Sequence, residues 1–92
     1  MAPLGRIGEF VVERWIDSDG DIHRYEATHP KTPQARIFVK ALAGGATRER
    51  LRAFFDEARA IAKSTEGALR LLDVGSTTDG GAFMILVDTS AS

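Results

Sequence analysis

Lys40 and Glu57 are the two residues whose types and surroundings could support chemistry. Lys40 lies near the end of an apolar segment, and Glu57 lies at the edge of an apolar helical stripe, between Phe54 and Ile61. A glutamate at that edge could turn toward a lysine on an adjacent sheet. The resulting ion pair would hold an ammonium group at a fixed point, where it could bind a phosphate. The spacing alone favours two solvated charges that never meet.

Three strands are predicted ahead of the residues around Glu57. Residues 9–16 are rich in β-branched and aromatic side chains, 17–21 have turn composition, and 22–28 are predicted to return as a second strand. Residues 35–42 are predicted as the third strand. This assignment places Lys40 on a strand, close to the point where the chain leaves the sheet.

The apolar spacing then changes to that of a helix, with Thr47 as the predicted N-cap. The residues of the apolar stripe are Leu51, Phe54, Phe55, Ala58, Ile61 and Ala62. Two further strands are predicted at 69–74 and 82–87, joined by a glycine-containing hairpin at 77–81. The order β-β-β-α-β-β predicts an α+β fold, in which a five-stranded, mostly antiparallel sheet packs against one helix.

Composition limits the classes of function. The chain has 92 residues, no cysteine and a formal charge of −1, and its length predicts one domain over 1–92. The lack of cysteine excludes disulfides, thiolate metal sites and a cysteine nucleophile, and it favours a reducing, cytoplasmic location. The near-neutral charge argues against nucleic-acid binding. No apolar run approaches the ~20 residues of a membrane-spanning helix, so no membrane association is predicted.

Other polar clusters are predicted to be structural. The acidic segment 17–21 suggests a calcium loop, but an EF-hand would need glycine and glutamate where Ile22 and Thr28 stand. His23 and His29 have no third ligand nearby, and no metal site is predicted. The helix is basic, and interleaved acidic residues predict a solvated face with ion pairs inside the helix. Its cations are Arg48, Arg50, Arg52, Arg59 and Lys63.

Several segments match a known family in order and spacing. They are Gly5–Glu13, Tyr25-Glu26-Ala27, Ile37-Phe38-Val39-Lys40, Phe54–Ala62, Leu69–Gly75 and Phe83–Asp88. Together they resemble the N-terminal lobe of a bacterial Ser/Thr protein kinase. Such lobes contain a Tyr-x-Ala strand, a Val-Ala-Ile-Lys strand, a helix with a glutamate, and two strands leading to a hinge. The resemblance covers about residues 5–89.

The resemblance implies roles for particular residues. Lys40 would hold the α- and β-phosphates of ATP, Glu57 would orient it, Leu86 would be the gatekeeper, and the hinge would run from Val87 to Thr89. The implied nucleotide contacts are Ile16, Lys40, Leu86, Val87 and Thr89. The catalytic residues of a kinase belong to its C-lobe, so this chain alone is expected to lack kinase activity. ATP with Mg²⁺ is expected only if a C-lobe completes the site.

The sequence also departs from the kinase pattern. The glycine-rich loop, whose backbone N–H groups approach the phosphates, aligns with 17–22, and its three glycine positions are Asp17, Asp19 and Ile22. The aspartates of this segment would set negative charge against a triphosphate. Phe38 stands where the family has alanine, and its ring would occupy much of the adenine slot.

Two functions follow from the resemblance and its departures. The first is a regulatory, pseudokinase-type module that binds a protein partner or its own C-lobe. The second is the ATP-binding half of a Ser/Thr kinase whose C-lobe lies outside this chain. The binding surface is predicted around Met84, Leu86 and Val87, where exposed apolar side chains could also support self-association.

Overall fold

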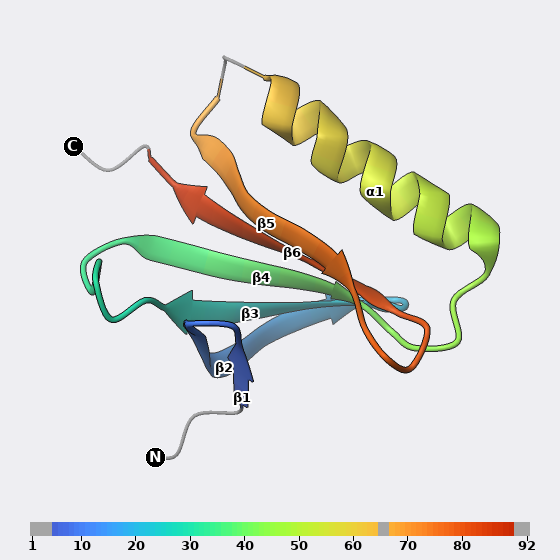
Figure 1. Cartoon of the computed structure of the whole chain (residues 1–92), viewed down its shortest axis with the longest axis horizontal. Coiled ribbons are helices and arrows are strands. Elements are labelled where there is room, and N and C mark those ends of the chain that lie inside the picture. The colour runs from blue at the N-terminus through green and yellow to red at the C-terminus, as the bar shows by residue number, and fades with distance from the viewer. Residues whose placement is uncertain (1–4, 65–66, 90–92) are drawn as a thin grey trace.

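The computed structural model describes residues 5–64 and 67–89, which form six strands and one helix (Figure 1). The elements are β1 (Gly5–Ile7), β2 (Phe10–Asp19), β3 (Ile22–Thr28), β4 (Arg36–Leu42), α1 (Arg48–Lys63), β5 (Leu69–Ser76) and β6 (Ala82–Asp88). The strands form one curled antiparallel sheet in the order β1-β2-β3-β4-β6-β5. The predicted α+β class is therefore confirmed.

The predicted number of five strands is wrong, because β1 adds a sixth. It pairs antiparallel with β2 around a tight turn at Gly8, whose φ of 60° favours glycine. A strand of three residues shows too little alternation to be recognised from its sequence. The prediction therefore began the sheet at residue 9 and missed this short edge strand.

The β2–β3 hairpin is also tighter than predicted. Strand β2 continues to Asp19, so the turn consists of Gly20 and Asp21 rather than of residues 17–21. Aspartate disfavours strands, which is why the segment was predicted as a turn. In the folded chain Asp17 lies opposite Arg24 on β3, and this cross-strand partner offsets the poor strand preference.

Helix α1 begins where it was predicted to begin. The hydroxyl of Thr47 accepts a hydrogen bond from the backbone N–H of Arg50 at 3.1 Å, as an N-cap does. The helix lies along β5 and β6, with Phe54 and Ala58 buried (Figure 1). Its other stripe residues are partly buried except for Ala62, which is exposed.

The core consists of two apolar clusters on opposite faces of the sheet, because successive residues of a strand point to opposite sides. The cluster facing α1 contains Leu42, Phe54, Ala58, Ala82, Met84 and Leu86. The cluster on the other face contains Val12, Ala27, Ile37, Val39 and Ile85. Within the described ranges, no helix is long and apolar enough to cross a membrane.

Candidate functional site

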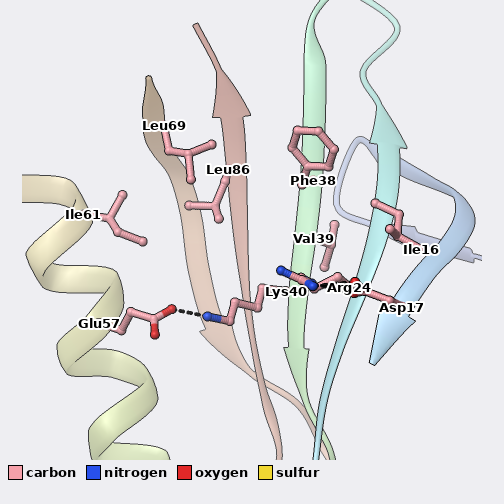
Figure 2. Close-up of a pocket in the computed structure, with 10 residues that line it drawn as sticks. All are labelled: Ile16, Asp17, Arg24, Phe38, Val39, Lys40, Glu57, Ile61, Leu69 and Leu86. Atoms are coloured by element: carbon pink, nitrogen blue, oxygen red, sulfur yellow. Dashed lines mark hydrogen bonds and ion pairs between the residues drawn. The ribbon is translucent and has the colours of Figure 1, made fainter. Parts of the chain in front are cut away.

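A pocket of about 460 Å³ lies between α1 and the side of the sheet that faces it (Figure 2). Its apolar lining residues are Ile16, Phe38, Val39, Ile61, Leu69 and Leu86, and its charged ones are Asp17, Arg24, Lys40 and Glu57. These residues come from five of the six strands and from the helix, and the folded chain brings them to one place. The site is therefore a product of the sheet order.

The structure brings Lys40 and Glu57 together. The Lys40 Nζ donates a hydrogen bond to Glu57 Oε2, and the two side chains point at each other across the pocket (Figure 2). Lys40 is 26% exposed and Glu57 47% exposed, so the pair is partly screened by solvent. Glu57 reaches the sheet because the buried Phe54 and Ala58 beside it turn this side of α1 toward the strands.

A second ion pair lies in the same row of the sheet. Arg24 stands between Asp17 on β2 and Lys40 on β4 in the strand register. Its guanidinium binds both carboxylate oxygens of Asp17, with Nε to Oδ1 at 2.6 Å. The hydrogen bond from Arg24 lowers the pKa of Asp17 below its ordinary value. Asp17 therefore stays ionised and compensates the arginine.

A third ion pair joins the β2–β3 turn to the helix. Arg50, in the first turn of α1, donates from Nε to Asp21 Oδ2 at 3.0 Å and from Nη2 to Oδ1 at 2.6 Å. This hydrogen bonding lowers the pKa of Asp21. The prediction that the basic helix pairs only with itself is wrong for Arg50, although Arg59 and Asp56 do pair at 3.4 Å. No local signal relates two residues that lie 29 positions apart.

The charges beside the pocket are therefore largely compensated. Asp17 and Asp21 were expected to set negative charge against a phosphate, but each is bound by an arginine. A second cleft of about 410 Å³ adjoins the pocket and is lined by Asp19, Ile22, Arg24, Lys40, Arg50 and Glu57. Because its three cations all have carboxylate partners, an anionic ligand would have to displace a carboxylate or use the donors that the ion pairs leave over.

The residues predicted to contact nucleotide separate into two groups. Ile16, Lys40 and Leu86 line the pocket, whereas Val87 and Thr89 do not. Val87 packs against the cluster on the opposite face of the sheet. Thr89 binds the carbonyl oxygen of Ala68 through both its backbone N–H and its hydroxyl, each at 2.7 Å.

Phe38 forms part of the apolar wall of the pocket. It pairs with Leu86 across β4 and β6, and its ring lines the pocket above Val39 and Lys40 (Figure 2). The apolar wall built by this ring and by Ile16 suits an uncharged group rather than a phosphate. The structure places Phe38 in this wall, next to Ile16 and Leu86 among the lining residues.

The exposed apolar surface differs from the predicted one. Met84 and Leu86 are 0% and 7% exposed, so the prediction that they form an open patch is wrong. They are buried because α1 packs over them, a contact that the strand pattern could not reveal. The large apolar side chains that are exposed in the described part of the chain are Trp15, Ile16, Leu69 and Leu72. Of these, Ile16 and Leu69 line the pocket.

Comparison with known proteins adds no functional information. Neither the known family models nor the curated proteins include a match to this chain.

Proposed function

We propose that this chain is a protein-kinase-like N-lobe that acts as a non-catalytic, regulatory module in the cytoplasm and binds a protein partner. The order β2-β3-β4-β6-β5, with the helix between β4 and β5, supports the proposal. The ion pair between Lys40 on β4 and Glu57 on α1 supports it as well. A separate kinase-like C-lobe is one form that the partner could take.

The composition of the pocket favours a protein partner over a nucleotide as its ligand. Its apolar wall contains Phe38, Ile16 and Leu69, and the last two are 40% and 41% exposed. Both cations of the pocket, Arg24 and Lys40, are bound by carboxylates. Such a site can bury an apolar side chain of a partner without breaking an ion pair, whereas a triphosphate would have to compete with the carboxylates.

Site-specific cross-linking tests the proposed partner surface. A photoreactive residue at position 69 should cross-link a defined protein in the cells from which the chain derives. Position 72 is a matched control, because Leu72 is also a leucine on β5, is 45% exposed, and lines a pocket with Phe10 and Val87 away from the site. A product formed equally from both positions, or from neither, would contradict binding at the pocket.

The second candidate is the ATP-binding half of a Ser/Thr kinase whose C-lobe lies outside this chain. One observation favours it, namely the contact between Lys40 and Glu57, since a lysine fixed by a glutamate is the arrangement that orients ATP phosphates in kinases. In that case nucleotide would have to displace Glu57 in part or bind the remaining donors of the ammonium group.

A thermal-shift titration with Mg-ATP separates the two candidates. The regulatory-module proposal predicts no change in Tm at millimolar nucleotide, for the wild type and for Lys40→Ala alike, because a ligand that does not bind the folded state cannot stabilise it. A saturable increase in Tm that is lost in Lys40→Ala would contradict this proposal and support the ATP-binding half.

A further inference from the structure

We propose that the ion pair between Asp21 and Arg50 is a latch that holds α1 against the sheet and thereby lets Glu57 reach Lys40. The latch would regulate the same site to which the previous proposal refers. Its regulatory meaning rests on that proposed function, whereas the coupling between the two ion pairs does not. Asp21 and Arg50 are thus positioning residues, which act on Lys40 through the placement of Glu57.

The helix is attached to the sheet unevenly. Its closest strands are β5 and β6, against which the buried Phe54 and Ala58 pack. Toward β3 and β4, a cleft of about 100 Å³ remains between helix and sheet, lined by Ile22, Lys40, Arg50, Ala53, Phe54 and Glu57. The ion pairs of Arg50 and Glu57 both lie at this cleft. On this flank the two ion pairs accompany the apolar contacts that Ile22 and Leu42 make in the cluster facing α1.

Arg50 and Glu57 act from the same side of the helix. They are seven residues apart, which is about two helical turns and returns nearly to the same direction. A small tilt of α1 about its packed flank would therefore move both side chains away from the sheet together. This geometry couples the pair at the start of the helix to the pair at its middle.

Both ends of the latch are anchored. The carbonyl oxygen of Asp21 accepts a hydrogen bond from the backbone N–H of Ala43 at 2.9 Å, which ties the β2–β3 turn to the segment leading into α1. The backbone N–H of Arg50 is bound by the Thr47 hydroxyl. Because both residues are held by backbone hydrogen bonds, the ion pair between them fixes the position of the start of α1 relative to the β2–β3 turn.

Asp21 also keeps Arg50 from competing for Glu57. The pKa of Arg50 is raised above its ordinary value, first by the hydrogen bond to Asp21 and to a smaller degree by the charge of Glu57. Arg50 thus lies within the field of the same carboxylate that binds Lys40. Without Asp21, the guanidinium would be free to turn toward Glu57.

The test is the reactivity of the Lys40 amine, since an ammonium group held by Glu57 is protected from acylation. The folded chain is treated with limiting N-hydroxysuccinimidyl acetate, and the rate at Lys40 is measured by mass spectrometry relative to Lys31 and Lys63. Asp21→Asn and Arg50→Gln should each raise the relative rate at Lys40 about two- to fivefold, the population change that an exposed ion pair can produce.

Asp56→Asn is the matched control, because it removes an Asp–Arg pair that lies within α1 and does not touch the sheet. It should leave the relative rate at Lys40 unchanged. The charge-exchanged double variant Asp21→Arg/Arg50→Asp should restore protection, which a general loss of stability would not do. Arg50→Gln also provides an independent measurement if Asp21→Asn does not fold.

Arg50→Gln decides between the latch and simple competition. If Arg50 only competes for Glu57, its removal leaves more of the carboxylate for Lys40, and the rate at Lys40 falls or stays constant. That result would overturn the latch. Because the measurement needs neither nucleotide nor partner, it can fail while the proposed function stands, and the cross-linking and Mg-ATP experiments can fail while the latch stands.

Discussion

At the scale of single residues, the site is defined by which charges are paired. Arg24, Lys40 and Arg50 come from two strands and the helix, and each meets a carboxylate from another element. Exposed pairs of this kind contribute little stability individually, because solvent screens them. Their importance here is chemical, because they leave the pocket without an uncompensated cation and orient the side chains around it.

The pairs predict how stability depends on acid. Hydrogen bonds from Arg24 and Arg50 lower the pKa values of Asp17 and Asp21 below the ordinary value of 3.8. A carboxylate with a lowered pKa stabilises the folded state above its unfolded pKa, and this contribution is lost as pH falls through the lowered pKa. Urea unfolding between pH 5 and about pH 2 should therefore show a smaller loss of stability in Asp17→Asn and Asp21→Asn than in the wild type.

Glu49→Gln is the control for the acid experiment, because it removes the same charge from the exposed first turn of α1. The loss of stability of Glu49→Gln on acidification should be closer to that of the wild type than the losses of the two aspartate variants are. If both aspartate variants lose as much stability on acidification as the wild type does, their pairs with arginine do not persist in solution.

At the scale of elements, one segment joins the two hairpins to the helix. The linker that follows β4 binds the β5–β6 turn, where the backbone N–H of Gly45 donates to the carbonyl oxygen of Asp79 at 3.0 Å. The same linker binds Asp21 of the β2–β3 turn through Ala43. The start of α1 is thus positioned by contacts at one end of the sheet.

This close approach predicts a large effect of adding one methyl group. A Cβ at Gly81 would clash with the backbone carbonyl oxygen of Leu42 and lie 3.0 Å from Thr77 Oγ1. Backbone cannot move aside as a flexible side chain can, so Gly81→Ala should destabilise the fold by about 2 kcal/mol. Gly5→Ala is the control, since no atom of the residues that the structure describes lies within 4 Å of its added Cβ, and it should change stability by less than about 0.5 kcal/mol.

Urea unfolding monitored by circular dichroism measures both glycine variants. Equal stability of Gly81→Ala and Gly5→Ala would show that the end of β4 does not approach Gly81 as closely as described.

At the scale of the whole molecule, the sheet has a stable centre and weaker edges. Strands β4 and β6 have neighbours on both sides and carry the least exposed residues, including Ile37, Val39, Met84 and Ile85. Strand β1 has three residues and, among the described strands, pairs only with β2. Apolar burial concentrated in the central strands makes them the part of the fold that opens last.

Hydrogen exchange should reveal this order. Amides of β4 and β6 should exchange only through global unfolding, so their apparent free energy of opening should fall with added urea. Amides of β1 should exchange through local fraying, with little dependence on urea. Comparable protection of β1 and β4, measured by exchange and mass spectrometry, would contradict the assignment of β1 as a weakly held edge.

Much of the fold followed from local patterns. The stripe with a period of 3.6 and the cap at Thr47 predicted α1, and apolar runs predicted β4 and β6, because these signals act between residues close in the chain. The position of Glu57 on its helix likewise indicated a residue able to face the sheet. Spacing alone favoured two charges that never meet, whereas the sheet order brings Lys40 and Glu57 into contact.

The sequence by itself thus determined the helix and the central strands, and it singled out Lys40 and Glu57 as candidates for the site. Only the tertiary structure decided that Arg50 binds Asp21, that Met84 and Leu86 lie beneath α1, and that Val87 faces away from the pocket. The physical reason is that ion pairing and burial depend on which distant segments become neighbours. Local propensity does not encode that proximity, which arises when the strands and the helix pack together.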